Sequence, residues 1–181
     1  MTDEAELESL RYPIGRLDLD APITEADHTR LIDEIASTPA NLRKAVEGLS
    51  ADQMATPYRE GGWTVHQLVH HVAESHMQAY SRCKFALTEE KPIIKPYDEA
   101  KWAETPDVPA TPAEISLALL DALQLRWVNL LRGLTPEEMQ RSFFHPEHGR
   151  LITIERMLAM YAWHGRHHVA HVTALRERNG W

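Results

Sequence analysis

Histidines gather in two short windows of this sequence, and their spacing suits metal chemistry. Eight of the eleven histidines lie in these windows, which hold His66, His70, His71 and His76, then His164, His167, His168 and His171. Imidazole binds divalent transition metals such as zinc, and two imidazoles four residues apart lie one helical turn apart on the same face. The pattern therefore predicts one metal site shared by two helices.

The second window contains two overlapping pairs with this spacing. His164 and His168 continue the apolar face of their predicted helix, so we expect them to face inward. His167 and His171 form the other pair, which is rotated by about 100° around the helix axis. Spacing alone allows either pair to bind the metal.

A third ligand has to come from the first window, and periodicity does not select it. His76 falls nearest the centre of the apolar stripe of that segment, whereas His70 and His71 lie toward its two flanks. Histidines that do not bind the metal remain candidates to hydrogen-bond the ligands or to move protons, and His167 is such a candidate for catalysis.

Four long segments with helical periodicity must position these histidines. They cover residues 24–49, 64–88, 111–133 and 153–179. Pro39 predicts a break or kink within the first of them. The proline-rich link over residues 89–111 is long enough to let the second and third helices run parallel. The sequence therefore predicts an all-α protein, a four-helix bundle with up-down-down-up topology, as one domain over residues 1–181.

The remaining segments carry weaker signals. Residues 1–23 contain three turn-forming residues, Pro13, Gly15 and Pro22, and no helical period, which predicts an irregular arm on the surface. Residues 141–152 are interpreted as a loop, and no segment shows the alternation of a convincing strand.

The charge balance argues against several classes of partner. The net charge is −8 at pH 7, whereas nucleic acid and anionic membranes select clustered Lys and Arg. No apolar run approaches the ~20 residues that span a bilayer, and the acidic first residues do not resemble a signal peptide. The single cysteine, Cys83, cannot form an internal disulfide. We therefore expect a cytoplasmic protein that binds neither nucleic acid nor membrane.

Two motifs around the histidines strongly resemble the YfiT-like branch of the DinB superfamily. They are PYREGGWTVHQLVHHVAESHM at residues 57–77 and YAWHGRHHVAH at residues 161–171. Shorter matches at residues 12–15, 95–99 and 144–146 extend the resemblance over nearly the whole chain. The resemblance implies a four-helix bundle in which His71, His164 and His168 bind one divalent metal, zinc or nickel, and it implies a homodimer.

Three neutral imidazoles leave a divalent metal an open position, as a catalytic site requires. The first hypothesis is a low-molecular-weight thiol S-transferase of the bacillithiol type, an activity found in branches related to the one that the motifs resemble. In it the metal binds a small thiol as thiolate, and the thiolate attacks an electrophile. The alternative is a metal-dependent hydrolase that activates water, with Glu74, three residues after His71, as the base. The third hypothesis is a non-catalytic metal-dependent binding or sensor protein. We prefer thiol transfer, because few acid or base groups accompany the predicted ligands.

Overall fold

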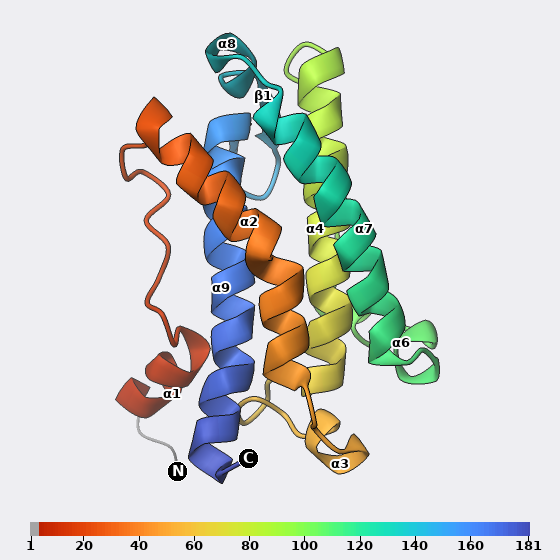
Figure 1. Cartoon of the computed structure of the whole chain (residues 1–181). Coiled ribbons are helices and arrows are strands. Elements are labelled where there is room, and N and C mark those ends of the chain that lie inside the picture. Colours follow the sequence, from red (N-terminus) through yellow and green to blue (C-terminus); the bar gives the residue numbers. More distant parts are fainter. Residues whose placement is uncertain (1–3) are drawn as a thin grey trace.

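Four long helices dominate residues 4–181, the part of the chain that the computed structural model describes (Figure 1). They are α2 (Glu25–Val46), α4 (Val65–Thr88), α7 (Ala113–Arg132) and α9 (Ile154–Asn179). Helix α2 packs against α7 and α9, and α4 packs against the same two helices, so the four close a ring. The four-helix bundle predicted from periodicity is confirmed.

The helix directions also follow the predicted up-down-down-up order. Helices α4 and α7 point the same way, α2 and α9 point the opposite way, and each parallel pair consists of ring neighbours (Figure 1). The link between α4 and α7 returns the chain to the starting end of α4. Two short helices lie in it, α5 (Glu99–Trp102) and α6 (Asp107–Ala110). A long link of this kind is what allows two consecutive helices to run parallel.

Two segments that we predict to be irregular have regular structure. Residues Glu4–Arg11 form α1, whose acidic first turn and basic Arg11 in the last turn complement the helix dipole. Ser142–His145 (β1) and Arg150–Thr153 (β2) form an antiparallel hairpin in which Phe143 lies opposite Ile152. The prediction of an irregular arm over residues 1–23 is therefore wrong for Glu4–Arg11, while its residues 1–3 lie outside the described part of the chain. The prediction of a loop over residues 141–152 is also wrong. Strands of four residues are too short to show a clear alternation in sequence.

Helix α2 continues through Pro39 without a break. The proline ring removes one hydrogen bond from the helix and crowds the preceding turn, and the axis of α2 changes direction near its middle (Figure 1). The sequence signal at Pro39 therefore corresponds to a kink. The remaining short helices are α3 (Ala51–Met54) and α8 (Pro136–Met139).

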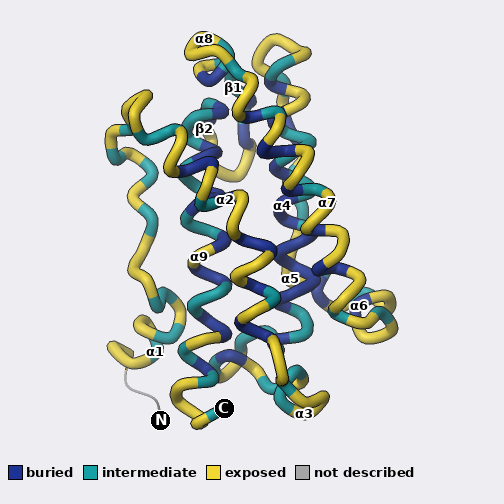
Figure 2. The backbone as a smooth tube through the Cα atoms, in the orientation of Figure 1, coloured by how far each residue is buried: buried dark blue, intermediate teal, exposed yellow. Residues whose placement is uncertain are grey.

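The apolar core falls into two clusters with a polar region between them. One cluster surrounds Trp127 and takes in the first part of α9, from Ile154 to Ala162. The other surrounds Leu68 and takes in Val172 and Leu175 of α9. The buried histidines of α9 lie between these stretches, and the buried positions of the long helices line the inside of the ring (Figure 2). The core thus holds α4 and α9 in place on both sides of the histidines.

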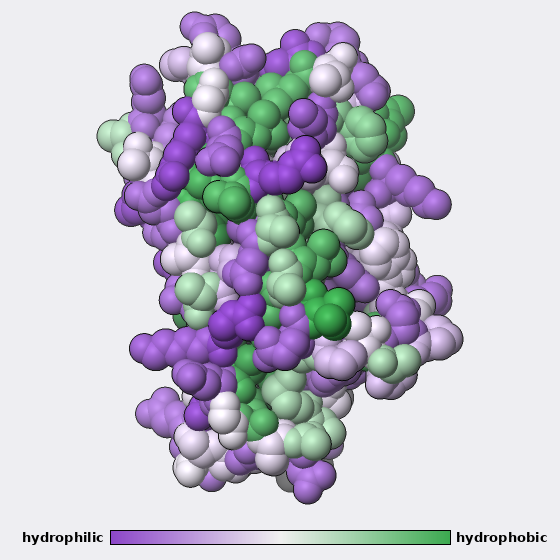
Figure 3. Space-filling view, turned by 45° about the vertical axis from the view of Figure 1, so that its right-hand side comes forward, coloured by the Kyte–Doolittle hydropathy of each residue, from purple (hydrophilic) through white to green (hydrophobic). Residues whose placement is uncertain are grey.

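The outer surface is mixed in polarity. Helix α7 keeps Ile115, Leu119 and Leu125 exposed. Figure 3 shows hydrophobic side chains in a band along the molecule, bordered by hydrophilic ones, on the face that it presents. Among the described residues, no helix combines the length and the apolar character needed to cross a bilayer.

Candidate metal centre

Three imidazoles converge where α4 and α9 face each other. His71 comes from α4, and His164 and His168 come from successive turns of α9. The ring centroids are 4.4 Å apart for His164 and His168, 4.9 Å for His71 and His168, and 5.4 Å for His71 and His164. One ring nitrogen from each residue lies within 4.8 Å of the others. The structure therefore brings together the three residues that the resemblance selects, in a cluster that one ion can bridge.

Burial keeps these three side chains in the form that binds metals. The pKa of His71 is lowered to about 4, because burial disfavours the charged ring. Burial also holds the pKa values of His164 and His168 well below the ordinary value, and the neighbouring imidazoles lower them further. All three rings are therefore neutral at pH 7 and have a lone pair to offer.

The hydrogen bonding of the ring nitrogens fits a metal. Nδ1 of His71 and Nδ1 of His168 are buried without a partner among the described residues, and such atoms are costly to bury unless an ion or water binds nearby. Nδ1 of His164 lies 3.2 Å from Nε2 of His76, so the other ring nitrogen of His164 is left for an ion. Three imidazole nitrogens suit a divalent transition metal and leave at least one coordination position for water or substrate.

Trp63, which packs against the cluster, lines a cavity of about 660 Å³, although none of the three clustered histidines lines it. The centroid of the indole ring lies 4.4 Å from that of His71 and 6.5 Å from that of His168. The lining comes from the loop before α4, the region of α5 and the hairpin turn, and consists of Tyr58, Arg59, Gly61, Gly62, Trp63, Pro96, Tyr97, Asp98, Glu99, Ala100 and Glu147. This aromatic and charged lining can hold a small polar molecule next to Trp63.

Glu74, the base predicted for hydrolysis, lies on the side of α4 that faces α6. Burial and, after it, the carboxylate of Asp107 raise the pKa of Glu74. His70, one turn before Glu74, is on the same side of the helix and makes a 2.7 Å hydrogen bond to Ser116 of α7. The charged group beside Glu74 therefore belongs to α6, and the role of Glu74 as a base stays a prediction.

A second carboxylate, Glu99, lines the cavity and was not identified from the sequence. Its charge contributes to the raised pKa values of Tyr97 and Tyr161, which are due mainly to burial. The hydroxyl of Tyr161 lies 3.3 Å from that of Ser75, which is one turn after His71. Helical periodicity could not reveal Glu99, because it becomes a neighbour of the site only when the link folds over α4 and α9.

The second histidine pair of α9 is engaged with the N-terminal arm. His167 stacks on Trp163, with ring centroids 4.2 Å apart and planes inclined by 18°, and the Tyr12 ring lies 5.9 Å away. The Nε2–H group of His171 donates to the carbonyl oxygen of Arg11 at 3.1 Å. A catalytic role for His167 stays a prediction.

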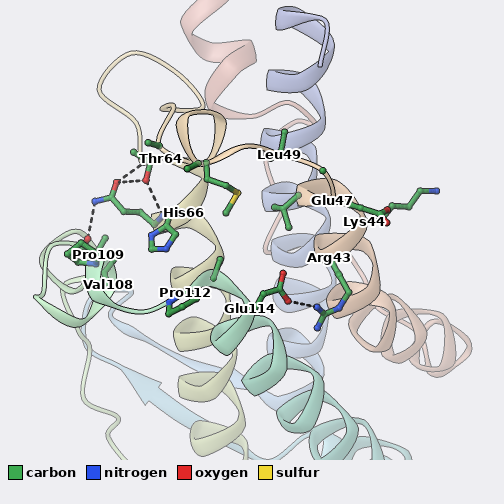
Figure 4. Close-up of a pocket in the computed structure, with 18 of the residues that line it drawn as sticks. Arg43, Lys44, Glu47, Leu49, Thr64, His66, Val108, Pro109, Pro112 and Glu114 are labelled. Carbon is green, nitrogen blue, oxygen red and sulfur yellow. Dashed lines mark hydrogen bonds and ion pairs between the residues drawn. The ribbon is translucent and has the colours of Figure 1, made fainter.

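A larger cavity, of about 1350 Å³, lies between the end of α2, α3 and the starts of α4 and α7 (Figure 4). Arg43 and Glu114 form a 2.8 Å ion pair at its edge. His66, which also lines it, makes a 3.1 Å hydrogen bond to the carbonyl of Thr111. Neither Trp63 nor any of the three clustered histidines lines this cavity, so it is separate from the candidate metal centre.

Known proteins with similar sequences cover nearly the whole chain. A sequence profile for the DinB superfamily matches residues 34–172. A protein of Bacillus mycoides (strain KBAB4) is 50% identical over 175 residues, which are 97% of this chain and 100% of that protein. A protein of Bacillus cereus (strain B4264) is 51% identical with the same coverage. Both carry the name "Putative metal-dependent hydrolase".

A solved structure shows the same fold. YfiT from Bacillus subtilis matches with a TM-score of 0.92 and 46% identity, covering 96% of this chain and 99% of that one. It is described as "a probable metal-dependent hydrolase with an unusual four-helix bundle topology". The profile spans most of the chain and the relatives span nearly all of it, so the resemblance seen in the histidine motifs is confirmed. This chain belongs to the DinB superfamily.

Proposed function

We propose that His71, His164 and His168 hold one divalent transition metal, zinc or nickel, and that the protein is a metal-dependent enzyme. The observation that carries this proposal is the convergence of three neutral imidazoles, two buried and one half-buried, within 4.8 Å of one another. The names of the two Bacillus relatives and of YfiT support metal dependence.

The chain's own residues prepare the centre for chemistry. A divalent metal bound here supplies a Lewis acid that lowers the pKa of a coordinated thiol or water. The three histidines are neutral, so they do not reduce the charge of the ion. Trp63 packs on His71 and lines the cavity of about 660 Å³, so it covers part of the ligand cluster and lies between His71 and the cavity.

The reaction that we propose is transfer of a low-molecular-weight thiol of the bacillithiol type to an electrophile. In this reaction a C–S bond forms, the leaving group departs with its electron pair, and the thiol proton passes to solvent. Such a transfer needs no protein carboxylate once the thiol is ionised. The surroundings of the three ligands agree with a reaction that needs no carboxylate, because their neighbours are mostly histidine and aromatic rings. Glu74 lies instead beside Asp107.

Thiol transfer is tested with untagged protein, stripped of metal and then reloaded with zinc or nickel. The protein is mixed with cysteine and chlorodinitrobenzene, and the thioether product is followed after subtraction of the uncatalysed rate. We expect product formation to require metal and to be lost in His71→Ala. Metal-loaded protein that forms no product above the uncatalysed rate would contradict thiol transfer.

Hydrolysis is the second candidate, and the names of the relatives favour it. Glu99, at the cavity beside Tyr97, is a carboxylate that can serve as a base for water, and Glu74 is the other. If metal-loaded protein hydrolyses a small ester and Glu99→Gln or Glu74→Gln abolishes the activity, hydrolysis replaces thiol transfer as the proposed reaction. Metal binding without turnover of any kind would favour a binding or sensor protein.

We also propose that two copies of the chain associate, as the resemblance implies. Each chain has a mass of 20.7 kDa. Sedimentation of the metal-loaded protein is expected to give twice this mass, and a species of single-chain mass at micromolar concentration would contradict the homodimer.

A further inference from the structure

Two polar side chains are buried in the apolar core beside the three-histidine cluster. His76 on α4 is fully buried, and Gln124 on α7 is 2% exposed. The amide nitrogen of Gln124 lies 2.7 Å from Nδ1 of His76. An amide and an imidazole lose hydration on burial, which an apolar pair of similar shape does not. Packing alone therefore does not account for these two residues.

His76 extends this contact to one of the proposed metal ligands. Its Nε2 lies 3.2 Å from Nδ1 of His164. The rings of Trp127 and Tyr161 pack nearly perpendicular to His76, with centroids 5.9 Å and 5.1 Å away and interplanar angles of 85° and 89°. These two rings hold the plane of His76. A continuous hydrogen-bonded chain therefore runs from Gln124 on α7 through α4 to α9.

The direction of the protons along this chain decides whether His164 can bind a metal. When the Gln124 amide N–H donates to Nδ1 of His76, Nε2–H of His76 donates to Nδ1 of His164. The proton of His164 is then on Nε2, where it blocks an ion.

A half rotation of the amide reverses the chain. The Gln124 oxygen then accepts from Nδ1–H of His76, Nε2 of His76 accepts from Nδ1–H of His164, and Nε2 of His164 is free for an ion. Oε1 of Gln124, which is otherwise buried without a partner, gains one in this arrangement. The chain therefore has one state that suits a metal and one that does not.

We propose that Gln124, acting through His76, is a positioning residue that holds His164 in the tautomer and orientation that bind the metal. This inference rests on the proposed metal centre. Of the three ligands, His164 has a ring nitrogen hydrogen-bonded to another side chain, His76, whereas Nδ1 of His71 and Nδ1 of His168 have no partner within residues 4–181 and are the atoms left for the ion in those two rings. Groups that hydrogen-bond a metal-binding histidine typically contribute about 10–100-fold to metal affinity.

The test compares zinc affinities, measured by competition with a chromogenic chelator. Gln124→Met keeps the side-chain length and removes both hydrogen-bonding groups, whereas Gln124→Glu keeps an acceptor for His76. Ser116→Ala is the matched control, because it removes another contact between α7 and α4, the 2.7 Å hydrogen bond from Ser116 to His70, which touches none of the three clustered histidines. Circular dichroism melting shows that each variant is folded at the temperature of the titration.

We expect Gln124→Met to weaken zinc binding about 10–100-fold, Gln124→Glu to restore at least the wild-type affinity, and Ser116→Ala to change it by less than about threefold. Unchanged affinity in Gln124→Met, or equal losses in Gln124→Met and Ser116→Ala, would overturn the inference and leave the metal centre in place. If Gln124→Glu does not fold, the zinc affinities of Gln124→Met and Ser116→Ala still test the inference. A wild-type protein that binds no zinc would overturn both proposals.

Discussion

Each buried histidine acquires its chemistry from the removal of water around it. Burial lowers the pKa of His71 to about 4 and that of His76 to about 3, and the neighbouring imidazole of His71 adds to the effect on His76. A neutral ring keeps a lone pair for a metal or for a hydrogen bond. The same burial makes the folded chain sensitive to acid, because these rings resist protonation until the chain unfolds.

The metal-free protein is therefore expected to lose stability between about pH 6.5 and pH 4. The folded-state pKa values of His71 and His76 lie below the unfolded value, so the unfolded chain binds more protons in this window, and stability falls as the pH is lowered. Each such histidine contributes a slope of up to about 1.4 kcal/mol per pH unit. Urea unfolding in the presence of a chelator should give a lower midpoint at pH 5 than at pH 7.5. Equal midpoints would contradict the neutral, buried state of these rings.

Two features of the site could not be predicted from individual residues in the sequence. The spacing of His164 and His168 is identical to that of His167 and His171, so periodicity could not choose between the pairs. In the fold, Arg11 and Tyr12, both more than 150 positions away, contact the second pair, and such contacts leave no trace in the spacing. Gln124 carried no signal at all, because a single polar residue in an apolar stripe has no distinctive spacing.

At the scale of elements, the position of α9 against α2 depends on one close approach. A Cβ atom added at Gly165 would meet Oγ1 of Thr38 and would lie 2.9 Å from its Cγ2. Thr38 is 2% exposed and packs from α2. The missing side chain of Gly165 therefore lets the two helices pack closely at the level of His164 and His168.

Gly165→Ala is expected to destabilise the protein by about 1–3 kcal/mol, the range typical of overpacking. In an unobstructed helix the same substitution would stabilise the protein by about 1 kcal/mol. The sign of the change in the free energy of unfolding, measured with urea, therefore shows whether Gly165 lies against Thr38. The cost should largely disappear in a Thr38→Ala background, where the obstructing atoms are gone. A stabilised Gly165→Ala variant, or an equal cost in both backgrounds, would contradict the close approach.

The long elements could be predicted from sequence because each repeats its apolar residues over many turns. The expected helix over residues 64–88, for example, differs from the observed Val65–Thr88 by one residue. The short elements could not be predicted. Ser142–His145 and Arg150–Thr153 are held by pairing with each other, and Ile94 joins Phe144 through a backbone hydrogen bond of 3.1 Å. These contacts are set by the fold and leave little trace in periodicity.

At the scale of the whole molecule, the proposed metal joins two helices that are far apart in sequence. His71 lies on α4, whereas His164 and His168 lie on α9, and the long link predicted from its prolines separates them. The topology was predictable from the length of that link. The cavity at Trp63 was not, because it arises from loops and short helices whose placement depends on the assembled bundle.

Metal binding should therefore stabilise the entire fold. At a free zinc concentration about 1,000 times the Kd, binding contributes about 4 kcal/mol, which for a chain of this size raises Tm by about 8–16 °C. Differential scanning calorimetry with and without zinc measures the shift, and His71→Ala should remove it. A Tm that does not depend on zinc in the wild-type protein would contradict a site that bridges α4 and α9.

The metal content of the purified chain tests the central claim most directly. Elemental analysis of untagged protein is expected to find one zinc or nickel per chain, and His71→Ala, His164→Ala and His168→Ala should each lose it. His167→Ala is the matched control on the same helix and should retain the metal. Protein without metal after loading, or metal content that the three substitutions leave unchanged, would contradict the three-histidine centre.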